Sequence, residues 1–251
     1  MLALLHDSQE AVTHIAVVFD NPIRSFRNDL YAPYKSDEGV PPELRSQFDA
    51  AEDAVRSIGV AVWSMREYEA DDGLASGARR FRDQVEQVRI LSPDKDLGQC
   101  LRGDLVVQVD RRQKKVTNEA AFRAERGFDP HSMADFLALT GDNADGFPGL
   151  PGFGKVSAAL LLGVYEHLEA IPADPLLWKV KPRGAVQLAA TLVAHREEAL
   201  LYRKLATLVE TLPLKESLED LEFRGVPKAR FESWCDELGI ARLKTVPKRW
   251  Q

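Results

Sequence analysis

The stretch Leu139-Thr-Gly-Asp-Asn-Ala-Asp-Gly-Phe-Pro-Gly-Leu-Pro-Gly-Phe-Gly-Lys-Val-Ser-Ala158 joins two carboxylates to a loop rich in glycine and proline. Asp142 and Asp145 stand three residues apart, and the aliphatic run over residues 158–162 predicts a helix after the loop. Such a loop exposes backbone N–H groups, and the helix N-terminus adds the positive end of its dipole, which together suit a phosphate. Carboxylates beside a phosphate-binding loop point to metal-dependent chemistry on a phosphodiester.

The composition is that of an ordinary globular protein, with 251 residues, of which 45% are hydrophobic and 29% charged. This length allows one large or two small domains with a proper core. No apolar run approaches the roughly 20 residues of a membrane span, and the N-terminus lacks the features of a signal peptide. Cys100 and Cys235 stand alone, without metal-ligand spacing. We therefore expect a reduced, cytoplasmic setting, no membrane contact and no structural zinc.

Charge is distributed unevenly along the chain. Residues 1–150 hold 18 basic and 26 acidic side chains, whereas residues 151–251 hold 15 and 13. The first part therefore carries a net charge of −8 and the second a net charge of +2. The excess acid coincides with the carboxylate motifs, so an acidic protein is compatible with a DNA substrate if those motifs hold divalent metal.

Acidic residues recur where predicted strands end. The β-forming run Ile15–Asp20 ends in an acid, at the edge where open α/β sheets place their sites. A helix over residues 43–58 and a strand over 60–63 complete a βαβ unit, which predicts a parallel sheet. Strands over residues 88–91 and 105–110 follow, and Asp94 and Asp96 come after the first of them. Each acid alone could cap a loop or helix, but their recurrence along one sheet indicates a site.

Glu69-Ala-Asp-Asp72 opens a predicted helix. Acids in a first helical turn complement the helix dipole, which is the simpler explanation. Three acids in four residues exceed what a cap requires, and their mutual repulsion is costly unless a cation joins them. A metal-binding role and a capping role both stay open for this cluster.

Basic and aromatic side chains alternate in the polar segment 21–42, which contains Arg27, Tyr34 and Lys35. Such interleaving suits single-stranded nucleic acid, because cations meet phosphates and rings stack on bases. Taken alone, the segment reads more simply as a solvated surface loop. Beyond residue 158 the pattern is helical, with predicted helices over 158–169, 186–208 and 227–238.

In this order the motifs resemble the 5′-nuclease superfamily, which comprises flap endonucleases and the N-terminal 5′→3′ exonuclease domain of bacterial DNA polymerase I. The matching motifs are Val17-Val-Phe-Asp20, Ser25-Phe-Arg27, Tyr34-Lys35, Glu69-Ala-Asp-Asp72, Asp94-Lys-Asp96 and the segment 141–154. The resemblance spans residues 12–243. It implies an α/β fold with a parallel-rich central sheet and flanking helices (PIN/FEN-like) over residues 1–130, with an arch region at 21–42. Residues 131–251 would form a helical part with a helix–three-turn–helix element that binds duplex DNA.

The resemblance also implies residue roles in a two-metal 5′→3′ exonuclease or 5′-flap endonuclease. Two or more Mg²⁺ or Mn²⁺ ions would be held by Asp20, Glu69, Asp71, Asp72, Asp94, Asp96, Asp142 and Asp145. Lys35 and Arg27 would meet phosphates during catalysis, and the Tyr34 ring would stack on the terminal base. Duplex DNA, and in relatives a K⁺ ion, would bind the element containing Gly149, Gly152, Gly154, Lys155 and Ser157. The substrates would be DNA 5′ ends, flaps and duplex–single-strand junctions, cut by a monomer without sequence preference during primer removal and repair.

Three departures from the superfamily pattern qualify this expectation. Its members begin with a strand that ends in a metal-binding Asp, and this chain starts after that strand, so a sheet without its first strand is expected. Residues 36–39 replace the Arg and Pro that usually follow Tyr-Lys, and acid there weakens the grip on single-stranded DNA. Val156 and Ser157 stand where Lys and Thr are usual, so Lys155 is displaced by about 100° around the helix.

Two other functions stay open on the sequence alone. The first is a DNA-structure-binding protein whose catalysis is impaired by loss of the first strand and one metal ligand. The second is a related nuclease directed at RNA. The chain ends at Pro247-Lys-Arg-Trp250-Gln, shortly after the nuclease motifs, so we expect a stand-alone nuclease without a polymerase part.

Overall fold

The computed structural model describes residues 1–251, which divide into two compact units. Unit 1 comprises residues 1–25, 36–73 and 213–251. Unit 2 comprises residues 26–35 and 74–212. Both units are therefore assembled from segments that lie far apart in the sequence.

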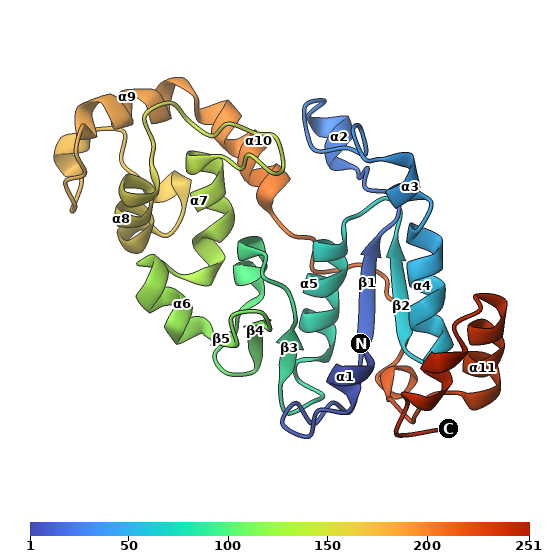
Figure 1. The fold of residues 1–251 in the computed structure, drawn as a ribbon. Coiled ribbons are helices and arrows are strands. Elements are labelled where there is room, and N and C mark those ends of the chain that lie inside the picture. The colour runs from blue at the N-terminus through green and yellow to red at the C-terminus, as the bar shows by residue number, and fades with distance from the viewer. The chain divides into compact units, whose positions relative to one another are not determined.

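Unit 1 contains the predicted βαβ unit. Strand β1 (Ala16–Asp20) pairs in parallel with β2 (Ala61–Met65), with Ala16 opposite Ala61 and Asp20 opposite Met65 (Figure 1). The connecting helix is interrupted: the predicted helix over 43–58 forms α3 (Pro42–Arg45) and α4 (Phe48–Ser57). The interruption has a local cause, because the side chains of Ser46 and Gln47 both donate to the Glu43 carbonyl.

The termini of the chain complete the core of unit 1. Ile58 and Val60 pack with Phe223, Phe231 and Cys235. These last residues come from the C-terminal segment, which contains the turn η5 (Glu219–Leu221), helix α11 (Lys228–Glu237) and the turn η6 (Ala241–Thr245). At the other end, the chain begins with a single helical turn, α1 (Leu2–Leu5). Asp7 Oδ1 accepts a hydrogen bond from Gln9 N, and this local turn replaces further helix.

Unit 2 contains a second, three-stranded sheet. Strand β3 (Val88–Ile90) pairs in parallel with β4 (Val106–Asp110), and β4 pairs antiparallel with β5 (Lys115–Thr117). The α/β class and the preference for parallel pairing agree with the sequence prediction. The strands lie in two sheets, β1–β2 in unit 1 and β3–β4–β5 in unit 2.

All five residues of β1 are half-buried. Helix α5 (Ala70–Phe81) buries Ala75 and Ala78 against Ile90, Leu97 and Val106 of unit 2. The residues after β3 form the 3₁₀ helix η1 (Lys95–Cys100).

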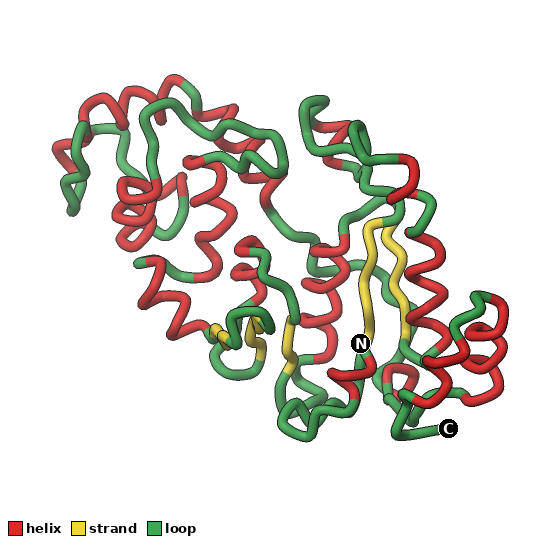
Figure 2. Tube along the Cα trace, viewed as in Figure 1, coloured by secondary structure: helices red, strands yellow, loops and turns green.

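The rest of unit 2 is helical, as predicted for the C-terminal part (Figure 2). Its elements are α2 (Arg27–Leu30), α6 (Glu119–Arg126), η2 (Pro130–Ser132), α7 (Met133–Thr140), α8 (Lys155–Tyr165), η3 (Leu168–Ala170), η4 (Pro175–Leu177), α9 (Ala185–Ala194) and α10 (Arg196–Ala206). The predicted helix over 186–208 thus breaks at His195, between α9 and α10. None of the helices is both long and apolar enough to cross a membrane.

Helix α7 is the centre of the helical core. Met133, Leu137 and Leu139 are fully buried, and α7 packs along α10. The Phe147 ring, which follows the carboxylate loop, stacks on Tyr202 of α10 with ring centroids 5.6 Å apart. This packing fixes both ends of the loop that carries Asp142 and Asp145.

Candidate metal centre

Three carboxylates of unit 2 converge in space. Asp96, Asp142 and Asp145 each offer one oxygen, and these oxygens all lie within 4.8 Å of one another. Asp96 belongs to η1, which follows β3, whereas Asp142 and Asp145 belong to the loop after α7. We call these three residues the acidic trio. The sequence predicted all three as metal ligands, and the fold brings them together from segments that are 46 residues apart.

The loop that carries Asp142 is held by its own backbone. Asp142 N donates to Phe147 O at 2.8 Å, and Phe147 N donates back to Asp142 O at 3.1 Å. Asp142 Oδ1 also accepts a hydrogen bond from Ala144 N at 2.8 Å, which ties this carboxylate to its own loop. The buried Phe147 ring anchors the end of this turn. The carboxylates therefore sit on a rigid turn rather than on a mobile loop.

Two glycines let this turn return onto the end of α7. Gly141 and Gly149 have φ values of +78° and +71°. A Cβ atom on Gly149 would lie 2.2 Å from Gly141 N, and one on Gly141 would lie 2.4 Å from the Pro148 carbonyl. Only glycine accommodates both the left-handed backbone and this main-chain contact. Gly149 thus has a structural role that is sufficient to explain its presence.

Two lysines neutralise the acidic trio. Lys95 Nζ donates a short hydrogen bond to Asp142 Oδ2 and lies 3.1 Å from Asp96 Oδ1. Lys35 Nζ lies 3.0 Å from Asp145 Oδ1, and the Lys35 backbone N–H donates to the Asp145 carbonyl at 3.0 Å. The sequence analysis predicted Lys35 as a functional residue but did not single out Lys95. The signal that points to Lys95 is its place between two acids, in Asp94-Lys-Asp96.

The trio carboxyls differ in their affinity for protons. The pKa of Asp96 is raised to about 7: burial is the largest cause, Lys95 lowers the pKa, and the charges of Asp94 and Asp142 raise it. Burial also raises the pKa of Asp142, but hydrogen bonds from Lys95 and from backbone N–H groups outweigh it and hold this pKa below its usual value. The same two carboxylates raise the pKa of Lys95 against the effect of its burial.

The trio fits a hard divalent cation. Mg²⁺ and Mn²⁺ prefer oxygen ligands, and here carboxylate oxygens converge from three side chains. The buried Asp96 Oδ1 has no well-formed hydrogen bond, and its nearest cation is Lys95 Nζ at 3.1 Å. A metal ion could take the place of this ammonium as the charge partner of the oxygen.

Asp94, also predicted as a ligand, lies outside the trio. It is exposed and serves as the N-cap of η1, where its Oδ1 accepts a hydrogen bond from Asp96 N at 3.0 Å. In this position Asp94 orients the backbone that presents Asp96.

The four other predicted carboxylates lie in unit 1, around the start of α5. Asp20 Oδ1, at the end of β1, accepts a hydrogen bond from Ala70 N at 2.6 Å, and Asp72 Oδ2 accepts one from Glu69 N at 3.0 Å. Ser25 Oγ donates to Glu69 Oε1 at 3.1 Å. Glu69 and Asp72 are buried and Asp71 is half-buried. The capping role that the sequence left open is therefore present, and it uses one oxygen of Asp20 and one of Asp72.

Arg27 and Tyr34, predicted to meet DNA, are buried within unit 2. Arg27 is 1% exposed, and its guanidinium donates to the carbonyls of Leu205 at 2.7 Å and Thr207 at 2.9 Å. The Tyr34 ring is 3% exposed and packs in the helical core. In this arrangement Arg27 holds the C-terminal end of α10, and Tyr34 anchors the backbone next to Lys35. Lys35, the third residue of this group, pairs with Asp145 of the acidic trio.

The predicted duplex-binding element lies at the start of α8. Gly154 is the N-cap, and its N–H donates to Ser157 Oγ at 3.0 Å. Gly152, Gly154 and Lys155 are exposed, while the buried Phe153 between them holds the turn against the core. The exposed backbone at the N-terminus of an eleven-residue helix is thus placed where an anion can approach it.

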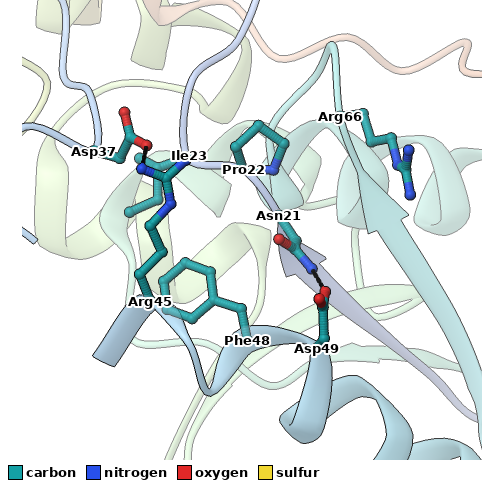
Figure 3. A pocket seen from close by; sticks show the side chains of 8 residues that line it. All are labelled: Asn21, Pro22, Ile23, Asp37, Arg45, Phe48, Asp49 and Arg66. Carbon is teal, nitrogen blue, oxygen red and sulfur yellow. Dashed lines mark hydrogen bonds and ion pairs between the residues drawn. The ribbon is translucent and has the colours of Figure 1, made fainter. Parts of the chain in front are cut away.

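A separate hollow of about 320 Å³ lies in unit 1, beyond the ends of β1 and β2 (Figure 3). It is lined by Asn21, Pro22, Ile23, Asp37, Arg45, Phe48, Asp49 and Arg66. Within it Asn21 donates to Asp49 at 2.8 Å, and Arg45 pairs with Asp37 at 2.7 Å. None of the eight predicted carboxylate ligands lines this hollow, so it is distinct from the acidic trio.

Known proteins resemble this chain over nearly its whole length. The family model "5′-3′ exonuclease, N-terminal resolvase-like domain" matches residues 1–127, and "5′-3′ exonuclease, C-terminal SAM fold" matches residues 128–229. A 5′-3′ exonuclease of Bacillus subtilis is 30% identical over 240 residues, which are 94% of this chain and 77% of that protein. DNA polymerase I of Bacillus caldotenax is 32% identical over 239 residues, which cover 93% of this chain. The chain spans about a quarter of the length of that polymerase (26%).

Solved structures share the fold. A bacteriophage T5 5′-exonuclease with bound divalent metal ions (zinc) has a TM-score of 0.68 at 18% identity, covering 93% of this chain and 86% of that one. The catalytic core of Rad2 in complex with DNA substrate has a TM-score of 0.52 at 16% identity, covering 92% and 76%. The fold is thus an α/β part with parallel strand pairing followed by a helical C-terminal part. Because both family models match in chain order and the Bacillus relative aligns over most of its length, the chain belongs to the 5′-3′ exonuclease family.

Proposed function

We propose that this chain hydrolyses DNA phosphodiesters near 5′ ends, flaps and duplex–single-strand junctions, with divalent metal ions held by its carboxylates. The observation that carries the proposal is the acidic trio, whose oxygens converge within 4.8 Å of one another in a member of this family. The T5 exonuclease binds divalent ions and the Rad2 core binds DNA substrate, and we extend both properties to this chain. We place this activity in the cytoplasm, as a monomer, in primer removal and repair.

In this proposal Asp96, Asp142 and Asp145 hold metal directly. Asp20, Glu69, Asp71, Asp72 and Asp94 are proposed as further carboxylate ligands in a two-metal arrangement. Bound Mg²⁺ or Mn²⁺ would polarise the scissile phosphate and lower the pKa of a bound water. The Asp142 backbone turn and the Asp94 cap keep the carboxylates in place before substrate arrives, so little ordering is left for the moment of binding.

Lys35 is proposed to contact the scissile phosphate. The Lys35 ammonium pairs with Asp145. The Lys35 side chain is 26% exposed, so part of this side chain already faces solvent. When a cation neutralises Asp145, the hold on Lys35 weakens and its Nζ can turn to a phosphate oxygen. We assign Arg27 and Tyr34 to the support of this position, Arg27 through α10 and Tyr34 through the adjacent backbone.

Duplex DNA is proposed to bind residues 149–157, around the start of α8, together with a K⁺ ion. Gly152 and Gly154 expose their main chain there, and Lys155 adds a cation. Contacts of backbone N–H groups and lysine with phosphates position a duplex without reading its sequence. The net charge of +2 over residues 151–251 favours binding of the negatively charged duplex to this part of the chain.

The proposal is tested by cleavage of a 5′-labelled DNA flap, comparing wild type with Asp142→Asn in the presence of Mg²⁺ or Mn²⁺. Asparagine keeps the oxygen that accepts from Ala144 N but removes the charge, so the loop folds and metal affinity falls. We expect the cleavage rate to fall at least about 100-fold, as is typical when a metal ligand, or a residue that orients one, is removed. Asp110→Asn is the matched control, since Asp110 also caps a turn but lies outside the trio.

Two outcomes would contradict the proposal. Flap binding without any cleavage, at every divalent metal tried, would favour the DNA-structure-binding protein over the nuclease. Cleavage of an RNA flap but not of its DNA counterpart would change the substrate class while keeping the metal chemistry.

A further inference from the structure

We infer that Lys95 is an internal counter-ion of the acidic trio, which competes with divalent metal and thereby sets the metal concentration at which the site fills. The inference rests on the proposed metal-dependent function. Lys95 would tune the metal affinity of the site, and it would be neither a metal ligand nor a catalytic residue.

The contacts of Lys95 place its charge among the trio oxygens. Its Nζ donates to Asp142 Oδ2 and lies 3.1 Å from Asp96 Oδ1. One ammonium therefore interacts with two of the three carboxylates that would ligate a metal. Lys35 pairs with the third carboxylate, Asp145, at 3.0 Å. A cation bound between Asp96 and Asp142 must displace the Lys95 ammonium, or lie a few ångströms from it and be repelled.

The lysine side chain can leave without disturbing the fold. It is 41% exposed, whereas the side chains of Asp96 and Asp142 are 10% and 5% exposed. The backbone that carries Lys95 is fixed on both sides, by the Asp94 cap of η1 and by the fully buried Leu97. The movable part is therefore the lysine side chain, which can turn into water while Asp96 stays in place.

The same contacts would also hold the trio together whenever no metal is bound. Carboxylates this close repel one another, and their burial makes the repulsion stronger than it would be in water. Lys95 offsets part of this repulsion in the metal-free protein. It follows that Lys95 stabilises the metal-free state and weakens metal binding by the same electrostatic interaction. Monovalent cations bring no more charge than the ammonium they would replace, so this competition favours divalent ions.

The test compares Mn²⁺ binding by wild type, Lys95→Met and Lys95→Arg. Free Mn²⁺ is measured by electron paramagnetic resonance during a titration of the whole chain, and thermal unfolding is followed with and without the metal. We expect Lys95→Met to bind Mn²⁺ about ten-fold or more tightly and to unfold at a lower temperature than wild type when metal is absent. Lys95→Arg keeps the positive charge and should retain an affinity within about three-fold of wild type.

Two further variants make the result specific. Lys115→Met removes a comparable lysine–carboxylate pair of unit 2, that of Lys115 with Glu125, which lies outside the trio, and should leave Mn²⁺ affinity unchanged. Lys95→Gln repeats the neutralisation with a polar side chain, in case the methionine perturbs folding. An unchanged or weaker Mn²⁺ affinity in both neutral variants would overturn the inference.

Asp142→Asn separates this inference from the proposed function. If Asp142→Asn weakens Mn²⁺ binding but the neutral Lys95 variants do not strengthen it, the trio binds metal and only the role of Lys95 is wrong. If Asp142→Asn leaves Mn²⁺ binding unchanged, the trio is not the metal centre, and the proposed function loses its site together with this inference.

Discussion

At the residue scale, glycines in the loop over 141–157 serve two different needs. Gly149 is required by the fold, because its φ of +71° and its contact with Gly141 exclude a side chain. Gly154 has a φ of −122°, and a Cβ atom on it would meet nothing within 4 Å. No neighbouring atom therefore requires glycine here, and either its N-cap position or the proposed approach of DNA to its backbone would account for it.

This difference allows a clean test of the duplex-binding surface. We expect Gly154→Glu to weaken binding of a blunt DNA duplex by about ten-fold, because the side chain blocks the backbone and repels phosphate. Gly154→Gln isolates the steric part. The binding titration is repeated at several salt concentrations, since only the charge contribution is screened.

Unfolding in urea provides the control for both variants. Neither should change the free energy of unfolding by more than about 0.5 kcal/mol, as is usual for exposed sites without strain. Gly152→Glu is unsuitable as a substitute, since the φ of +84° at Gly152 adds backbone strain to any effect on DNA. Equal duplex affinity in wild type, Gly154→Glu and Gly154→Gln would mean that this turn does not face DNA.

At the scale of elements, one arginine joins three parts of the helical core. Arg203 of α10 donates to Asp135 of α7 at 3.0 Å, and its two terminal nitrogens reach Glu169 of η3 at 2.7 and 2.5 Å. The hydrogen bonds from Arg203 outweigh burial and lower the pKa of Glu169 to about 2. The interaction therefore requires the ionised carboxylate.

The pH dependence of stability follows from this lowered pKa. Because the folded-state pKa lies below the ordinary value of 4.5, the contribution of Glu169 is fully present above pH 4.5 and is lost as the pH falls towards 2. Glu169→Gln should reduce the free energy of unfolding at pH 7 by at most about 1 kcal/mol, because a half-exposed ion pair is screened by solvent. Chemical denaturation at pH 7, 4.5 and 2.5 should show this difference shrinking at the lowest pH. A constant difference across the three pH values would mean that the pair contributes through packing alone.

The packing of helices also decides which basic and aromatic side chains face the solvent. Arg27 and Tyr34 occupy a polar, aromatic segment that resembles a DNA-contacting surface in the sequence. The fold instead buries both and uses them to hold α10 and the backbone beside Lys35. Local pattern cannot distinguish these outcomes, because the carbonyls that Arg27 satisfies lie about 180 residues away in the sequence.

At the scale of the whole molecule, metal binding should have a local signature in unit 2. The acidic trio joins η1 to the loop after α7, so a bound ion cross-links two segments that are remote in sequence. Saturating Mn²⁺ should therefore slow amide hydrogen exchange over residues 95–100 and 141–147. At a metal concentration of 100 times Kd, linkage adds about 2.7 kcal/mol to stability, and EDTA should abolish it.

The β4–β5 hairpin is the internal reference for this exchange experiment, because it lies in the same unit but carries no trio residue. Equal slowing in the hairpin and in the two site segments would indicate a general stabilisation. No slowing in either segment would place the metal elsewhere.

Several features of this protein could be read from the sequence by itself. Hydrophobic periodicity predicted β1, α4 and β2 as a βαβ unit, and the α/β class with a helical C-terminal part follows from it. Asp142 and Asp145 were identifiable because their spacing and the adjacent glycines are local, and local backbone geometry is encoded in nearby residues.

Tertiary structure alone decided which of the predicted residues meet. It placed Asp96 with Asp142 and Asp145, left Asp94 as a cap, and brought Lys95 between two carboxylates. It also divided the strands into two sheets and buried Arg27. These outcomes depend on contacts between residues far apart in the chain, and the packing that selects such contacts is a property of the whole fold rather than of any local pattern.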